Sequence, residues 1–382
     1  MIYLDNSATS YPKPEKVYQA VYTCLREGGN PGRGVNKSAL NMSRIIFEAR
    51  SELAGFFNLK NESRLIFTKN VTEAINQVLK SFLQKGDHVL VSPVEHNAVM
   101  RPLEFLKETR GVEYDIIPGD KAGNIKLDDM ETMIKENTKL ITINHASNVL
   151  GTILPVKKVN QIAKKHGVFT LVDAAQTAGV IPIDVEDLGV DFFAFTGHKG
   201  LLGPQGTGGL YVKDNIALEP LIHGGTGTNS KVLRQKGIFP DDFESGTVNV
   251  PGIAGLLEGT RYCRENQEKI RSHEKTLMEK LLVYLTDNPA IQITGPDRIE
   301  ERVGLVTFNI SNMDSDMVGQ ILDQEDEIAV RTGLHCSPLA HEIAGTLEMG
   351  GVRISVGPFT REEDIDNLIR ALDRITEMRS NY

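Results

Sequence analysis

The chain has 382 residues, of which 40% are hydrophobic and 24% are charged, and its net charge is -9. This length exceeds one ordinary hydrophobic core, so we expect two domains in a folded, globular protein. The acidic balance argues against a nucleic-acid-binding surface, no stretch approaches the ~20 apolar residues of a membrane span, and the N-terminus lacks the basic and apolar regions of an export signal.

Between residues 64 and 212 the sequence alternates short apolar runs with helical patterns such as Val71–Leu83 and Val156–Lys165. The apolar runs predict strands at Arg64–Thr68, His88–Ser92, Glu113–Ile117, Leu140–Asn144, Val168–Val172, Phe192–Thr196 and Gly208–Val212. Several runs are almost entirely apolar, as in strands covered on both faces. The alternation predicts an α/β fold with a mostly parallel central sheet, in which ligands bind at the carboxyl ends of the strands.

After about Pro251 the pattern changes. We expect helices over Gly252–Asn288, a strand at Val303–Ile310, a helix at Ser315–Gln324, a loop at Arg331–Pro338, a strand at Val352–Val356 and a helix from Thr360. These elements predict a smaller α+β domain. We therefore divide the chain into a large α/β domain, residues 15–255, and a small domain made of residues 1–14 and 256–382. The glycine-rich segments Gly28–Gly34 and Gly224–Ser230 are predicted loops.

Lys199 stands where a predicted strand gives way to a glycine-rich loop. An isolated lysine in this place is usually a surface residue after an edge strand. Because burying an ammonium group is costly, a lysine is rarely placed in such a setting for packing. A desolvated lysine has a lowered pKa, which is what Schiff-base chemistry requires.

Other polar groups also follow predicted strands. Asp173 needs a cationic partner or strong donors, and the helix start at residues 68–76 offers free amides to a phosphate. His96 can stack on a flat ring or shuttle protons, and Asn148 can donate to a ring oxygen or to a substrate carboxylate. Taken singly, each has an ordinary structural explanation as a cap, a helix start, a buried histidine or a turn. Together with Lys199 they are the groups that bind pyridoxal phosphate (PLP).

The sequence resembles the fold-type I PLP enzymes of the class V aminotransferase group and, within it, the cysteine desulfurase/selenocysteine lyase family. The resemblance covers nearly the whole chain and lies in Tyr3–Thr9, Thr72–Asn76, Ser147–Gly151, Thr196–Lys199, Glu244–Thr247 and Arg331–Cys336. It implies a large PLP-binding domain, a smaller domain with an acceptor cysteine, and a homodimer.

The resemblance also implies residue roles. It assigns cofactor contacts to Lys199, Asp173, Gln176, His96, Val71, Thr72, Thr196, His198 and Thr247, the last from the other subunit of the dimer. It assigns substrate contacts to Asn148, Arg353 and Ala8, and the catalytic steps to Lys199, His96 and Cys336. In such enzymes L-cysteine leaves as L-alanine and its sulfur passes to the acceptor cysteine as a persulfide.

Three cysteines, Cys24, Cys263 and Cys336, lie far apart and form neither a disulfide framework nor a zinc pattern, which suits a reducing cytoplasm. Cys336 lies in a predicted loop beside a histidine, so it is the better candidate for a reactive thiolate. A metal site with His335 and His341 lacks a fourth ligand, and we expect none.

Arg353 follows Cys336 by 17 positions (353 − 336), which resembles the branch with a short acceptor loop, whose members commonly depend on a partner protein to withdraw the sulfur. Asn97 and Val71 depart from that branch, where a second histidine and a small hydroxyl residue are frequent, so the preferred substrate stays open. The alternatives are a selenocysteine or cysteine-sulfinate lyase, a class V aminotransferase or epimerase, and a non-catalytic scaffold of this fold.

Overall fold

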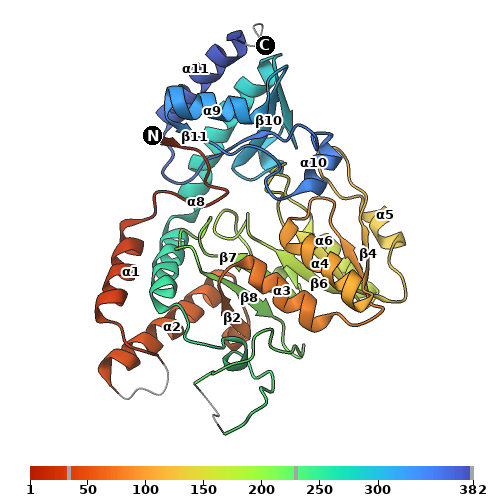
Figure 1. The fold of residues 1–382 in the computed structure, drawn as a ribbon, viewed down its shortest axis with the longest axis vertical. Coiled ribbons are helices and arrows are strands. Elements are labelled where there is room, and N and C mark those ends of the chain that lie inside the picture. Colours follow the sequence, from red (N-terminus) through yellow and green to blue (C-terminus); the bar gives the residue numbers. More distant parts are fainter. Residues whose placement is uncertain (32–35, 228–230, 379–382) are drawn as a thin grey trace.

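The computed structural model describes residues 1–31, 36–227 and 231–378. Its centre is a seven-stranded sheet in the order β2-β8-β7-β6-β5-β3-β4 (Figure 1). The strands are β2 (Leu65–Thr68), β3 (His88–Val91), β4 (Glu113–Ile116), β5 (Thr138–Asn144), β6 (Phe169–Asp173), β7 (Phe192–Thr196) and β8 (Gly208–Val212). Only β8 runs antiparallel to its neighbours, so the predicted α/β fold with a mostly parallel sheet is confirmed.

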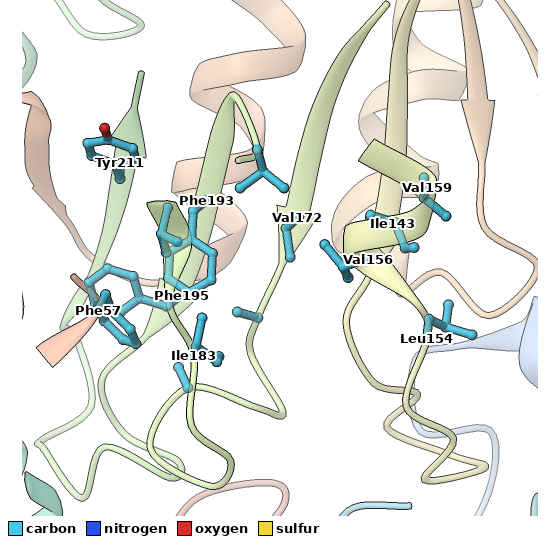
Figure 2. Packing of buried hydrophobic residues seen from close by; sticks show 14 of the residues in the cluster. Phe57, Ile143, Leu154, Val156, Val159, Val172, Ile183, Phe193, Phe195 and Tyr211 are labelled. Carbon is cyan, nitrogen blue, oxygen red and sulfur yellow. The ribbon is translucent and has the colours of Figure 1, made fainter. Parts of the chain in front are cut away.

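Helices cover both faces of this sheet because its strands are apolar on both sides. Phe192 and Ala194 of β7 pack toward α3 (Val71–Phe82) and α4 (Asn97–Arg110). Phe193 and Phe195 face the other way, toward α6 (Val156–Lys165) and α7 (Val185–Leu188). On that side the ring of Phe57 lies 5.0 Å from the Phe193 ring and 5.1 Å from the Phe195 ring, between centroids (Figure 2). The two buried layers hold the carboxyl ends of the strands in fixed positions.

A second, smaller part of the chain contains a three-stranded antiparallel sheet in the order β12-β10-β9. Its elements are β9 (Ile291–Thr294), β10 (Leu305–Ile310), α9 (Ser315–Asp326), α10 (Pro338–Ala344), β12 (Val352–Ser355) and α11 (Glu362–Met378). The N-terminal strand β1 (Ile2–Tyr3) pairs in parallel with β11 (Ile328–Ala329), so the start of the chain belongs to this smaller part. This mixture of helices and antiparallel strands agrees with the expected α+β arrangement, although the sequence did not predict β9, β11 and α10.

One helix, α8 (Val250–Asp287), connects the two parts (Figure 1). Its first turns pack with the large sheet and with α1 (Glu15–Glu27) and α2 (Lys37–Phe56), and its last turns pack with the small sheet. The proposed domain boundary at residues 255/256 therefore falls inside a helix, and the division into 15–255 and 1–14 with 256–382 stays a prediction.

The remaining elements are short. They are α5 (Leu127–Thr132) and single 3-10 turns at Glu62–Arg64, Asp241–Phe243 and Ile299–Glu301. Of the two predicted glycine-rich loops, residues 28–31 and 224–227 contain no helix or strand, and residues 32–34 and 228–230 lie outside the described residues. No helix in the described ranges is long and apolar enough to cross a membrane.

Candidate active site

The predicted polar side chains gather at the carboxyl edge of the large sheet. Asn144 at the end of β5 is paired with Asp173 at the end of β6, which in turn is paired with β7. Lys199 follows β7 and, with Gln176, lines a cavity that also touches the N-terminal segment and the residues after β12. The sequence placed these groups at strand ends, and the sheet order brings those ends together.

Lys199 is largely withdrawn from solvent. Burial, followed by the positive charge of Arg353, lowers the pKa of its ammonium group to about 8, although the carboxylates of Asp173 and Asp5 act in the opposite direction. Near neutral pH a fraction of the molecules therefore carries Lys199 as the free amine, which is the form that attacks a carbonyl carbon.

The N-terminal segment fixes the peptide group in front of Lys199. The carbonyl oxygen of His198 accepts hydrogen bonds from the amide of Ser10 (3.0 Å), the hydroxyl of Thr9 (3.1 Å) and Nζ of Lys13 (3.3 Å). Burial lowers the pKa of Lys13 to about 8. Lys13 had no predicted role, and its only signal in the sequence is its place between two prolines.

Asp173 is 4% exposed, and one of its oxygens accepts the amide of Ala175 at 2.8 Å. Burial raises the pKa of Asp173, whereas the Lys199 ammonium lowers it. The other oxygen is available to a cationic ring nitrogen, which would repay the cost of burying the charge. Gln176, just beyond β6, donates from Nε2 to the backbone oxygen of Ser7 at 3.2 Å, so its place depends on the N-terminal segment.

Glu95 is a second buried carboxyl group beside this one. Its Oε1 accepts hydrogen bonds from the Ser92 hydroxyl and the Asn144 amide, both at 2.8 Å, and Oε2 has no partner among the described residues. Burial, followed by the negative charge of Asp173, raises the pKa of Glu95 to about 8. Glu95 is therefore mostly neutral at pH 7, which the sequence did not indicate.

His96 caps the N-terminus of α4. Its Nδ1 accepts the amide of Ala98 at 3.0 Å, so in the neutral ring the proton is on Nε2. Burial, followed by the positive charge of Lys199, lowers the pKa of His96 to about 4. His96 thus remains a neutral ring at working pH, able to stack on a flat cofactor and to exchange a proton through Nε2.

The start of α3 lies close to the end of β7, and this region presents hydrogen-bond donors of the kind that suit an anion. Gly208 is paired with Thr196, and its backbone lies against Asn70, the N-cap of α3. The first-turn amides of Val71 and Thr72 have no partner within the helix. Nearby, the buried Nδ1 of His198 has no hydrogen-bond partner among the described residues.

Arg353 and Asn148 lie together in the buried wall between the two sheets. Arg353 donates from Nη1 to the backbone oxygen of Asn148 and from Nη2 to Oδ1 of Asp5, both at 3.0 Å. Asp5 also accepts a hydrogen bond from Nε of Arg331 at 2.9 Å and forms an ion pair with Nη2 of Arg331 at 2.8 Å. The role of Asp5 was missed, although it lies in the Tyr3–Thr9 motif.

Two predicted contacts differ in their settings. The amide of Ala8 donates to the carbonyl of Asp5 at 3.0 Å, so Ala8 lies in a turn. In the sequence this turn stands between Asp5, which pairs with Arg353, and Ser10, which bonds to the His198 carbonyl in front of Lys199. Thr247 is exposed and lines a separate hollow with Lys69 and Thr207. Thr247 is thus available for contact from outside the chain.

Cys336 is exposed at the tip of a short loop, whereas Cys24 and Cys263 are buried and burial raises the pKa of both. The carbonyl of Cys336 accepts the amide of Asn97 at 2.9 Å, so the loop is attached next to His96. The neighbouring His335 bonds through Nδ1 to another histidine at 3.2 Å.

Comparison with known proteins identifies the family. The description Aminotransferase class-V matches residues 2–368. A probable cysteine desulfurase of Methanothermobacter thermautotrophicus is 38% identical over 99% of this chain and 95% of its own length. The solved structure of a cysteine desulfurase from Thermococcus onnurineus has a TM-score of 0.92 and 31% identity, covering 98% of this chain and 94% of that one. The cysteine desulfurase CsdA of Escherichia coli has a TM-score of 0.87 and 28% identity, covering 98% and 94%.

The residues at the sheet edge fit PLP. Lys199 would supply an amine of lowered pKa for its aldehyde, and Asp173 a buried carboxyl group for its ring nitrogen. The start of α3 and the Nδ1 of His198, which has no partner among the described residues, would supply donors for its phosphate. The chain belongs to the class V aminotransferase family and, within it, to the PLP-dependent cysteine desulfurases.

Proposed function

We propose that this chain takes the sulfur of L-cysteine onto Cys336 as a persulfide and releases L-alanine. The observation that carries the proposal is the position of the exposed Cys336 thiol. Its loop is hydrogen-bonded to Asn148 through the carbonyl of His335, and to Asn97, next to His96, through the carbonyl of Cys336. The names of the relatives supply the reaction class.

In this proposal Arg353 and Asn148 bind the substrate carboxylate. The buried Nε of Arg353 has no partner among the described residues, and the Asn148 amide has a second hydrogen beyond the one it donates within the protein. A guanidinium suits a carboxylate because its parallel N–H groups match two oxygens. Asp5 holds that guanidinium in place.

Bound PLP would supply an electron sink for negative charge at the substrate α-carbon. Lys199, as a free amine, takes the α-proton and later returns a proton to the substrate carbon skeleton. His96 stays neutral and can pass a proton through Nε2, because Nδ1 is engaged by Ala98. Asp173 would hold the ring nitrogen and balance positive charge there.

The sulfur step is then an exchange of bonds. The thiolate of Cys336 attacks the substrate sulfur, the S–S bond forms, and the bond between sulfur and the β-carbon breaks. The electron pair stays with the carbon, which takes a proton to become the methyl group of alanine. Of the two thiol protons at the start, one ends on that methyl group and the other on the persulfide or in solvent.

A substrate panel tests this function: L-cysteine, L-selenocysteine and L-cysteine sulfinate, each with the parent enzyme and Cys336→Ala. We expect alanine from L-cysteine with the parent, and a loss of at least about a hundredfold in the variant, as for removal of an attacking group. Unchanged alanine release would refute the role of Cys336 and favour a lyase, and a keto acid or D-amino acid product would indicate an aminotransferase or epimerase. Protein that stays colourless after PLP is added would indicate a scaffold.

We further propose a homodimer that works in the cytoplasm and passes its sulfur to an acceptor protein. The dimer is supported by exposed Thr247 and by large apolar side chains exposed in the adjoining segment, Ile222, Val232, Leu233 and Ile238. The free state of all three cysteines supports a cytoplasmic location. The short loop that carries Cys336 supports transfer of the sulfur to an acceptor protein. Light scattering of the PLP-loaded protein tests the dimer, and a monomeric mass would overturn it.

A further inference from the structure

The carboxamide of Asn148 bonds to both neighbours of Cys336. Its Nδ2 donates to the backbone oxygen of His335 at 2.7 Å, and its Oδ1 accepts the hydroxyl of Ser337 at 2.6 Å. Asn148 is 5% exposed and Ser337 is fully buried, so water does not replace either bond easily. We call this pair of hydrogen bonds the Asn148 bridge.

The bridge holds a loop whose backbone is not in a relaxed conformation. His335 and Cys336 have φ values of 52° and 59°, so two consecutive residues with side chains adopt the left-handed region. The turn is closed by the Ser337 amide, which donates to the carbonyl of Leu334 at 3.0 Å. Such a conformation persists only where surrounding contacts determine it, and the bridge supplies two of them.

The orientation of the Asn148 carboxamide follows from the same contacts. The His335 carbonyl can only accept, so Nδ2 must face it and Oδ1 must face Ser337. The second hydrogen of Nδ2 is then the one left for a substrate carboxylate. Without the Ser337 hydroxyl, Oδ1 is buried with no donor, and the amide loses one of the two contacts that fix its plane.

We propose that Ser337 is a positioning residue, which through the Asn148 bridge aligns the substrate-carboxylate donor with the acceptor thiol. The proposal rests on the proposed function of Asn148 and Cys336. It predicts that loss of one hydroxyl, without change to Asn148 or Cys336, loosens the loop and weakens substrate binding together.

The first measurement uses cofactor-free protein and needs no activity. The rate at which iodoacetamide alkylates Cys336, followed by peptide mass, is compared between the parent and Ser337→Ala. We expect an increase of about three- to tenfold, which corresponds to the loss of one buried hydrogen bond. The second measurement uses PLP-loaded enzyme, where KM for L-cysteine should rise by about the same factor. If both quantities stay within twofold of the parent, the proposal is wrong.

Matched variants separate the hydroxyl from a change of packing. Ser337→Thr and Ser337→Val have nearly the same shape, and only the threonine keeps the hydroxyl, so the comparison holds even if Ser337→Ala fails to fold. We expect faster alkylation in the valine variant than in the threonine variant, and equal rates would overturn the proposal. Thr260→Val removes a buried hydrogen bond within α8, from the Thr260 hydroxyl to the carbonyl of Leu256 (2.8 Å), which involves no residue of the Cys336 loop, and it should leave both readouts near the parent.

A double-mutant cycle with Asn148→Ala tests whether the two residues act as one unit. Once Asn148 is alanine, Ser337→Ala should add little to the alkylation rate, and full additivity would contradict the bridge. The alkylation results stand even if the parent releases no alanine from L-cysteine, so failure of the proposed function is distinguishable from failure of this inference.

Discussion

Glu95 and Asp173 are two carboxyl groups at one sheet edge with different environments. Both are buried, but Asp173 has the Lys199 ammonium nearby, whereas the described groups that act on Glu95 are neutral donors and the charge of Asp173. Burial and a like charge both favour the protonated form of Glu95. Of the two carboxyl groups, Asp173 is therefore the one better suited to pair with a cation, and Glu95 supports the segment that carries His96 through its hydrogen bonds.

Replacing Glu95 by glutamine tests this assignment. The unfolded chain releases the Glu95 proton at its ordinary pKa of about 4.5, whereas the folded chain keeps it until about pH 8, so the free energy of unfolding falls across that range. The total penalty is of the order of 4 kcal/mol at pH 8, and Glu95→Gln removes it.

Melting temperatures of the parent and Glu95→Gln should therefore be similar near pH 4.5 and should diverge as pH rises, with the variant more stable at pH 8. The exposed Glu136→Gln is the control for removal of a charge, and its curve should follow the parent. Parallel curves for Glu95→Gln and the parent would show that Glu95 is ionised in the folded protein.

The lowered pKa of Lys199 predicts how cofactor-free protein takes up PLP. Since only the free amine reacts with the aldehyde, the rate of uptake, measured by absorbance, should rise with pH and level off above about pH 8. Arg353→Met removes the positive charge that helps lower this pKa, so its midpoint should move to higher pH. A midpoint near the ordinary value for lysine, 10.5, in the parent would contradict the buried setting.

At the scale of elements, most of the large sheet could be predicted because each strand is a short apolar run bounded by polar residues. Phe192–Thr196 and Gly208–Val212 have the predicted bounds, and β6 extends through Asp173, the residue predicted to follow it. Parallel order then places Lys199 beside Asp173. By contrast, the bonds from Asp5 to Arg353 and from Ser337 to Asn148 join residues distant in sequence, and no periodicity indicates such pairs.

Helix α8 packs directly on the loop that follows Lys199, and Gly259 makes this approach possible. A side chain at that position would place its Cβ 2.4 Å from the backbone oxygen of Leu201. Gly259→Ala should therefore separate α8 from the loop and lower the stability by about 1–3 kcal/mol, with weaker retention of PLP in gel filtration. Gly55→Ala in α2 meets no atom within 4 Å and should be neutral or stabilising by up to about 1 kcal/mol. Equal effects of the two would show that close packing is not the cause.

On the scale of the whole molecule, Asp5 joins three segments that are far apart in the sequence. It follows β1, pairs with Arg331 at the start of the Cys336 loop, and pairs with Arg353 in β12. The same N-terminal segment continues to the carbonyl of His198, in the loop that follows β7. One buried carboxylate thereby connects Arg353 and the Cys336 loop, and the segment that follows it reaches the loop of Lys199.

Asp5→Asn tests this connection. The variant keeps the shape but leaves the Arg353 guanidinium, 2% exposed as a residue, without its counter-charge, and breaking a buried ion pair on one side typically costs about 3–5 kcal/mol. Urea unfolding should show this loss, and KM for L-cysteine should rise because Arg353 is no longer held. Glu327→Gln breaks another ion pair of the N-terminal region, between Met1 and Glu327 at 3.2 Å, but both partners are exposed and the expected cost is below about 1 kcal/mol. If the two variants lose equal stability, the Asp5 carboxylate does not hold these segments together, and the arginine must be positioned by its bond to Asn148 alone.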